Sequence, residues 1–375
     1  MIRSRTAVLY GMRAPKPYAD SRPLKIEDAV LDAPGRGEVL VRIRAASLCH
    51  SDLSVIDGTR PWVMPMALGH EAAGIVQEVG PDVADLAPGD HVICVFVPSC
   101  GHCLPCREGR PAHCENGLAA NRAGALLSGG VRLRVGGRAI HHHLGVSGFS
   151  EYAVVSRHSL VKVDPDIAFD RVALFGCAVL TGVGAVFNTA RVQAGSTAAV
   201  VGLGGVGPCA LLGALAAGAR RVFAVDINPV KLALAKELGA EEAFDARDEE
   251  TVERLSQAYG GGVDYAFETA GAVRALDTAF AVTRRGGATI TSGLPDPDAR
   301  LALSPTVLTA EERTLKGSYM GSCVPARDIP RLLEMHRAGR LPVDRLPVLR
   351  IALDDINRGF DELARGDVFR VMLTF

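Results

Sequence analysis

A glycine-rich turn between an apolar strand and a helix is the feature that most constrains this fold. In "AAVVGLGGVG", Gly202 and Gly204 lie at the end of a predicted strand at 198–204, and Gly207 follows where a helix opens. Glycines at this spacing let the backbone turn tightly and approach a pyrophosphate at the helix N-terminus. A second predicted strand at 221–227 follows at once, and a strand–helix–strand unit of this kind predicts a parallel sheet.

The same alternation continues along the chain as far as 321. Strands are predicted over 198–204, 221–227, 241–246, 263–270, 287–293 and 313–321, with helices between them that include 206–218, 229–238 and 272–284. Repeated strand–helix units of this length favour a doubly wound parallel sheet, so the fold class is predicted to be α/β.

The chain before residue 198 differs in composition and in its predicted secondary structure. It is rich in Gly, Pro and Val, and short strands are predicted over 38–48, 72–80 and 90–97, before one long helix over 169–190. The tail, 322–375, contains a helix or two and a strand that could rejoin the first domain. The predicted domains are therefore a mainly β domain formed by 1–178 with 322–375, and a parallel-sheet domain formed by 179–321.

Composition excludes several classes of partner. The 375 residues carry 41 Lys and Arg against 42 Asp and Glu, which argues against binding to nucleic acid or to an anionic membrane surface. The uncharged stretch 198–219 is about as long as a membrane span, but glycines and Pro208 interrupt it. The N-terminus has too short an apolar run for a signal peptide, so a cytoplasmic location with reduced cysteines is expected.

Four cysteines lie close together in "SCGHCLPCREGRPAHC", residues 99–114. Thiols at this spacing cannot all pair as disulfides without strain, whereas four thiolates suit one tetrahedral ion with no open position. A structural zinc is favoured over disulfides and over an iron–sulfur cluster, which also accepts four cysteines. The predicted ligands of this lobe, 97–116, are Cys100, Cys103, Cys106 and Cys114.

Three separate motifs, "CHSD", "GHE" and "GCAVLTG", offer a second metal site. Their Cys49, His70 and Cys177 would supply two thiolates and one imidazole, leaving a fourth position for water or substrate. Spacing alone does not establish a shared metal, because an isolated buried cysteine is usually a small core residue. The run "HHH" at 141–143 is not predicted to bind metal, since adjacent side chains point in different directions.

An acidic residue ends the second strand of the glycine-rich unit. Asp226, in "AVDIN", lies about twenty residues after the glycines, where a carboxylate would accept hydrogen bonds from the adenosine ribose hydroxyls. The same carboxylate would repel a 2′-phosphate, so NAD is predicted rather than NADP. An ordinary acid at the end of a strand is the alternative interpretation.

Together these motifs make the chain resemble the zinc-dependent alcohol dehydrogenases of the medium-chain dehydrogenase/reductase superfamily, in particular their liver-type branch. The motifs occur in the family's order, and the resemblance covers essentially the whole chain. It implies a GroES-like catalytic domain, a Rossmann domain that binds NAD, and two zinc ions per subunit. The implied reaction is hydride transfer between NAD(H) and a primary alcohol or aldehyde, medium-chain or aromatic.

The resemblance also implies roles for single residues. Catalytic zinc would be held by Cys49, His70 and Cys177, with Asp52 orienting His70, Glu71 just behind the metal, and Ser51 passing the hydroxyl proton outward. Structural zinc would be held by Cys100, Cys103, Cys106 and Cys114. Cofactor contacts are implied for His50 and Arg370 at the pyrophosphate, Asp226 and Lys231 at the ribose, Thr181 and Val206 at the nicotinamide, and Gly202, Gly204 and Gly207 in the turn. The implied substrate pocket contains Arg60, Phe96, His143 and Leu144.

Two positions depart from the family pattern. Ser54 stands where the liver-type proton relay ends in a histidine, so ordered water or His50 is expected to carry the proton out. Arg60 stands where the glutathione-dependent formaldehyde branch carries an acid, which disfavours a thiol-adduct (formaldehyde-type) dehydrogenase, the main alternative. A non-catalytic NAD-binding relative is a further alternative, and the intact zinc-ligand set speaks against it. The long segment 114–142, which yeast-like tetrameric members lack, predicts a homodimer.

Overall fold

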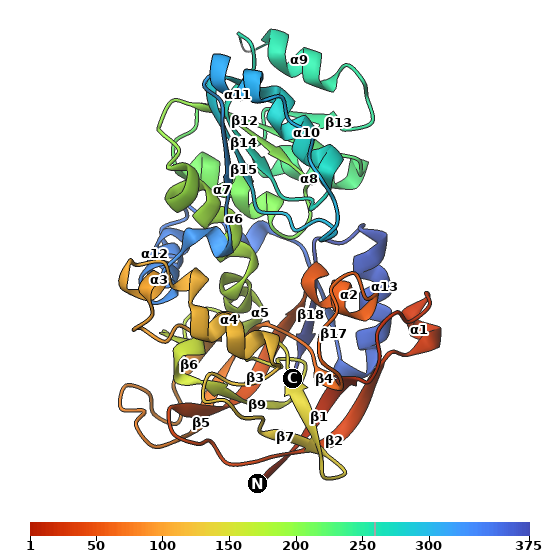
Figure 1. The fold of residues 1–375 in the computed structure, drawn as a ribbon, viewed down its shortest axis with the longest axis vertical. Helices are drawn as coiled ribbons and strands as arrows, with labels where there is room; N and C mark the ends of the chain where they lie inside the picture. The colour runs from red at the N-terminus through yellow and green to blue at the C-terminus, as the bar shows by residue number, and fades with distance from the viewer. Residues whose placement is uncertain (259) are drawn as a thin grey trace. The chain divides into compact units, whose positions relative to one another are not determined.

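The computed structural model describes residues 1–258 and 260–375, which divide into two compact units (Figure 1). The first unit comprises Met1–Cys177, Val324–Arg331 and Pro347–Phe375, and the second comprises Ala178–Cys323 and Leu332–Leu346. The sequence-based division assigns all of 322–375 to the first domain, whereas the structure places Leu332–Leu346 in the second unit. There Arg345 Nη2 donates to the carbonyl oxygen of Glu237 and ties the segment down.

Strands dominate the first unit, as predicted. A closed barrel has the strand order β1 (Ile2–Leu9), β2 (Leu24–Leu31), β7 (Leu133–Val135), β8 (Arg138–His142) and β4 (Met66–Ala67). A seven-stranded sheet has the order β10 (Leu160–Val163), β6 (His91–Cys94), β5 (Glu71–Val79), β3 (Glu38–Leu48), β18 (Arg370–Thr374) and β17 (Val348–Ile351), with β9 (Tyr152–Ser156) also paired to β3. The α-helices of this unit are α1 (Tyr18–Ser21), α2 (His50–Ile56), α3 (Leu104–Arg107), α4 (Glu115–Arg122), α5 (Phe169–Val172) and α13 (Ile356–Arg365).

The C-terminal strand does rejoin the first domain. β18 runs antiparallel to β3, with Val371 opposite Leu48. The helix before it, α13, buries Ile356, Phe360 and Leu363, which the helical repeat places on one face. This pairing brings Arg370, the first residue of β18, beside the end of β3.

The second unit is built on a six-stranded sheet whose paired strands are all parallel. Its order is β13 (Glu242–Asp245), β12 (Arg221–Asp226), β11 (Thr197–Val201), β14 (Val263–Glu268), β15 (Thr283–Thr291) and β16 (Thr314–Gly317). The helices are α6 (Ala178–Gly184), α7 (Gly207–Ala216), α8 (Pro229–Glu237), α9 (Thr251–Ala258), α10 (Val273–Val282), α11 (Pro305–Ala310) and α12 (Pro325–Arg337), the last of which crosses the division of the chain. The strand order reverses between β11 and β14, and ligands bind beyond the strand ends at such a point.

The long helix predicted over 169–190 is wrong in one respect, because the chain breaks at Cys177. A 3₁₀ turn, Ala173–Gly176, precedes the break, and α6 with a π turn, Ala185–Ala190, follows it. A Cβ on Gly176 would lie 2.3 Å from the Cys94 carbonyl oxygen, so only glycine lets this turn approach β6. Among the described residues no single helix is long and apolar enough to cross a membrane, although the bent pair Phe169–Gly176 and Ala178–Ala190 meets the length and composition test.

Candidate active site

Three side chains from distant parts of the first unit converge on one buried point. The ligand atoms of Cys49, His70 and Cys177 all lie within 4.8 Å of one another. Cys49 directly follows β3, His70 directly precedes β5, and Cys177 follows the 3₁₀ turn. Gly69 has φ +95°, and a Cβ there would lie 2.6 Å from the Phe149 amide nitrogen. Glycine is therefore needed for the turn that presents His70.

The donor set fits a zinc ion with an open position. Cys177 Sγ lies 3.6 Å from His70 Nε2, and the corresponding edge of a zinc tetrahedron is about 3.6 Å for ordinary Zn–S and Zn–N bonds. The Cys177 thiol hydrogen-bonds to Cys49 and lowers the pKa of Cys49 well below its usual value, while the same contact, with burial, raises the pKa of Cys177. A divalent cation would therefore be needed to hold both sulfurs as thiolates.

Asp52 fixes the orientation of the His70 ring. Its Oδ1 lies 3.2 Å from His70 Nδ1, and its Oδ2 accepts a hydrogen bond from the Cys49 amide at 3.1 Å. Because Nδ1 faces the carboxylate, Nε2 is left to face the two sulfurs. Burial opposes ionisation of Asp52, but His70 and His143 outweigh it and lower the pKa of Asp52 to about 2. The carboxylate is therefore charged at neutral pH.

A buried cation lies beside this group. Arg370 is only 2% exposed; its Nη1 donates to the Leu48 carbonyl oxygen at 3.2 Å, and its Nη2 lies 3.4 Å from Glu71 Oε2. Burial opposes the charge, but Glu71 and the two cysteines raise the pKa of Arg370. Its Nε and Nη2 make no hydrogen bond within the described chain; because Nη2 faces Glu71, Nε is the donor that remains available to an anion.

The four cysteines of the lobe bring their sulfur atoms together. Cys100, Cys103, Cys106 and Cys114 form the second sulfur cluster, with all four Sγ atoms within 4.8 Å of one another. The Sγ atoms of Cys103 and Cys114 are 3.9 Å apart, close to the edge of about 3.8 Å expected around zinc. Backbone amides point at the sulfurs: Cys100 N donates to Cys114 Sγ at 3.2 Å, and Gly117 N donates to the same atom at 3.3 Å. Such donors stabilise thiolates, so the lobe suits a closed zinc site.

The glycine motif borders a cavity of about 200 Å³ at the ends of β11 and β12. Gly202 has φ +93°, and a Cβ on Gly207 would lie 2.0 Å from the Gly202 carbonyl oxygen, so the fold itself requires glycine at both. A Cβ on Gly204 would meet nothing within 4 Å. The protein's own packing therefore does not explain Gly204, whereas the close approach of a pyrophosphate would.

The other predicted cofactor residues lie around this turn in the second unit. Asp226 ends β12 and lines the cavity; its Oδ2 accepts from Leu203 N at 2.5 Å and its Oδ1 from Asn228 N at 2.9 Å. Lys231 is half-buried on α8. Thr181 on α6 and Val206 at the start of α7 are brought together because Gly182 allows the two helices to touch. A Cβ on Gly182 would lie 2.6 Å from the Val206 carbonyl oxygen.

Two of the predicted substrate and proton-transfer residues lie beside the proposed zinc ligands. Phe96 packs edge-on against His70, with ring centroids 5.6 Å apart, and Ser51 Oγ lies 3.9 Å from Cys49 Sγ. Leu144 and Arg60 are half-buried, and His50 is exposed. Ser54 Oγ donates to the His50 carbonyl oxygen at 2.7 Å, so its hydroxyl proton is already used in a hydrogen bond to the helix backbone.

The surroundings of His143 could not be predicted from the sequence. His143 is only 1% exposed, and its Nδ1 lies 3.0 Å from Asp52 Oδ1. The single tryptophan, Trp62, packs edge-on against it with centroids 5.6 Å apart. The two preceding histidines do not join it: His142 instead contacts Ser147 Oγ through Nδ1 and accepts from Arg132 N through Nε2. Nothing in the spacing of "HHH" marks the third histidine as different from the other two.

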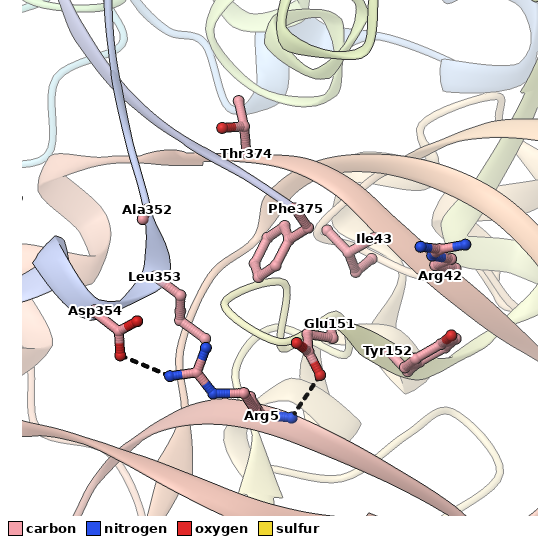
Figure 2. A pocket seen from close by; sticks show the side chains of 10 residues that line it. All are labelled: Arg5, Arg42, Ile43, Glu151, Tyr152, Ala352, Leu353, Asp354, Thr374 and Phe375. Atoms are coloured by element: carbon pink, nitrogen blue, oxygen red, sulfur yellow. Dashed lines mark hydrogen bonds and ion pairs between the residues drawn. The ribbon is translucent and has the colours of Figure 1, made fainter.

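A larger cavity in the first unit, about 310 Å³, lies away from these groups (Figure 2). Arg5 spans part of its wall, pairing with Asp354 at 2.6 Å, and its amide donates to Glu151 at 3.0 Å. Ile43 and the C-terminal Phe375 supply apolar surface. No predicted site residue lines this cavity, so its size does not make it the active site.

Comparison with known proteins decides the family. The chain matches the alcohol dehydrogenase GroES-like domain over residues 35–165 and the zinc-binding dehydrogenase family over residues 205–337. It is 39% identical over 356 residues to an NDMA-dependent alcohol dehydrogenase of Amycolatopsis methanolica, covering 94% of this chain and 96% of that protein. The chain belongs to the zinc-dependent alcohol dehydrogenases of the medium-chain dehydrogenase/reductase superfamily.

Two solved structures extend the match to the whole fold of this alcohol dehydrogenase. An alcohol dehydrogenase zinc-binding domain protein from Burkholderia ambifaria is 36% identical with a TM-score of 0.93, over 100% of this chain and 99% of that one. A benzyl alcohol dehydrogenase from Acinetobacter calcoaceticus is 30% identical with a TM-score of 0.93, over 100% of both chains. The predicted fold class, a GroES-like domain plus a Rossmann domain, is confirmed.

The two glycines of the turn in this alcohol dehydrogenase make a matched pair for testing the nucleotide site. Gly204→Ala should leave the melting temperature near the wild-type value and weaken NADH binding by about tenfold or more, because the added methyl group occupies the ligand's approach. Gly207→Ala should instead lower stability by about 1–3 kcal/mol, since its Cβ meets the backbone. Fluorescence titration with NADH and thermal melts would measure both. Unchanged NADH affinity in Gly204→Ala would contradict the assignment.

Proposed function

We propose that this alcohol dehydrogenase transfers hydride between NAD(H) and a primary alcohol or aldehyde of medium chain length or with an aromatic ring. The observation that carries the proposal is the buried convergence of Cys49, His70 and Cys177 on one point in a chain of this family. When bound, zinc supplies a Lewis acid for the substrate oxygen, and the nicotinamide ring accepts or returns the hydride.

The protein's own side chains orient and deprotonate the substrate in this proposal. Asp52 holds the His70 ring so that its Nε2 faces the metal position, and Phe96 covers one edge of that ring against water. Ser51 Oγ accepts the hydroxyl proton of the alcohol while its own hydroxyl proton passes to the next acceptor, so that Ser51 stays neutral. Because the Ser54 hydroxyl proton is already bound to the His50 carbonyl oxygen, we propose that the proton leaves through the exposed His50 ring or through water.

NAD is proposed over NADP because of how Asp226 is held. Two backbone amides, of Leu203 and Asn228, bind its two oxygens and fix the carboxylate at the end of β12. A fixed negative charge there accepts the ribose hydroxyls and opposes a 2′-phosphate. Lys231 is proposed to contact the ribose. Arg370, whose Nε makes no hydrogen bond in the described chain, is proposed to contact the pyrophosphate.

An alcohol panel with three hydride acceptors tests the proposal. Benzyl alcohol and hexanol should exceed ethanol in kcat/KM by more than about tenfold, since each buried methylene contributes about 0.8 kcal/mol. NAD, NADP and NDMA should each be supplied, because one relative is named for dependence on NDMA. Equal rates with NAD and NADP would overturn the assignment of Asp226. Turnover with added NDMA but none with added NAD would overturn the proposal that NAD from solution accepts the hydride. If formaldehyde with glutathione is the best substrate, the protein is a thiol-adduct dehydrogenase. The argument that Arg60 disfavours this substrate is then wrong.

We also propose that the protein is a cytoplasmic homodimer. The segment 114–142 carries the ordered elements α4, β7 and β8, and β16 ends its sheet with β15 as its one neighbour in the described chain. A strand edge of this kind suits pairing with a second copy. Sedimentation at micromolar concentration should give twice the mass of the 375-residue chain; a monomer or a tetramer would refute the proposal.

A further inference from the structure

Asp52 Oδ1 is crowded by donors. His70 Nδ1 lies 3.2 Å from it, His143 Nδ1 3.0 Å, and the Gly69 amide donates to it at 3.1 Å. A carboxylate oxygen offers about two lone-pair positions, so three nitrogen donors cannot all bind it at full strength. The other oxygen, Oδ2, accepts from the Cys49 amide.

His143 is held in this position from several sides. Its backbone amide donates to the Ala67 carbonyl oxygen at 3.2 Å, and its ring packs edge-on against both Trp62 and His70, the latter at 5.5 Å between centroids. Its Nδ1 has no well-directed hydrogen bond within the described chain, and Asp52 Oδ1 lies beside it at 3.0 Å.

The His143 ring must carry a proton on Nδ1. A lone pair on Nδ1 would face the Asp52 carboxylate at 3.0 Å and be repelled by it. His143 and His70 therefore present the same kind of N–H group to the same oxygen. Each N–H that Asp52 binds reduces the negative charge that it offers to the others.

We propose that His143 is a positioning residue that competes with His70 for Asp52 Oδ1 and thereby weakens the hydrogen bond that makes His70 a more basic ligand. This inference rests on the proposed function, in which His70 holds the catalytic zinc. An orienting carboxylate raises the basicity of a ligating histidine. A second N–H donor that binds the same carboxylate lowers the basicity of that histidine again. The catalytic zinc would then be held less tightly and would remain a stronger Lewis acid.

Two substitutions separate the N–H of His143 from its ring. His143→Phe keeps a ring against Trp62 and His70 but removes the N–H. His143→Asn removes the ring but keeps an N–H-bearing nitrogen on Cγ, where Nδ1 is attached. The measurements are zinc release to a chromogenic chelator, followed separately for the two sites, and the visible spectrum after cobalt replaces the catalytic zinc.

The expected result is that His143→Phe loses catalytic zinc about three- to tenfold more slowly than wild type, with shifted cobalt bands, while His143→Asn resembles wild type. Release from the four-cysteine site should not change in either variant, and it serves as the internal control. Unchanged or faster release in His143→Phe, or a change in His143→Asn alone, would overturn the inference. The wild-type zinc content and alcohol panel test the proposed function independently, so failure of one is not mistaken for failure of the other.

Discussion

Replacing Cys177 by serine is expected to reduce alcohol turnover to background, by more than about a thousandfold in kcat/KM, or about 4 kcal/mol. Serine keeps the size of the side chain, which is 7% exposed, but its hydroxyl is not ionised at neutral pH and is a poor zinc ligand. We expect two zinc ions per chain in the wild-type protein and one in this variant. The melting temperature should stay near the wild-type value, because serine fills nearly the same space and the sulfur contacts side chains of the site, His70 and Cys49.

Cys94→Ser is the matched control for this substitution. Cys94 is fully buried, and burial alone raises the pKa of its thiol to about 12, so it is an ordinary core cysteine. This variant should keep two zinc ions and measurable turnover, while losing some stability because a hydroxyl is buried in an apolar site. A Cys177→Ser variant that retained two zinc ions or normal turnover would show that Cys177 is not a ligand.

The parts of this molecule that could be predicted from sequence are those with a local signature. The glycine turn, β11 and β12 needed only their own residues, because strand, turn and helix are adjacent in the chain. The four-cysteine lobe is equally local. The return of 369–375 to the first domain could also be predicted locally, because an apolar strand needs a neighbouring strand to pair with; it pairs with β3.

The parts that could not be predicted depend on tertiary contacts. The helix break at Cys177 follows from the approach of Gly176 to the Cys94 carbonyl oxygen, which no periodicity reveals. The shared metal position of Cys49, His70 and Cys177 joins residues far apart in the chain, so only the family resemblance suggested it. The contact of His143 with Asp52 had no signal of either kind: the family pattern pointed to the substrate, and the structure points to the carboxylate.

Replacing Cys103 by serine is expected to remove the other zinc ion and to destabilise the protein by about 3 kcal/mol or more. Cys103 is buried at the centre of the lobe: its Sγ lies 3.9 Å from Cys114 Sγ, and its amide donates to Cys100 Sγ. A closed site contributes folding energy directly, because the unfolded chain does not assemble four thiolates. Without one ligand, the remaining thiolates repel one another in a half-buried lobe.

Thermal melts and zinc-to-protein ratios, with and without chelator, measure this effect. Chelator should lower the melting temperature of wild-type protein toward that of Cys103→Ser and should change the variant much less. Cys209→Ser is the matched control: its sulfur is buried outside both clusters, 3.6 Å from the Gly205 carbonyl oxygen, where a hydroxyl can also donate. It should keep both zinc ions and a melting temperature close to the wild-type value. A Cys103→Ser protein with two zinc ions and an unchanged melting temperature would show that the lobe holds itself together without metal.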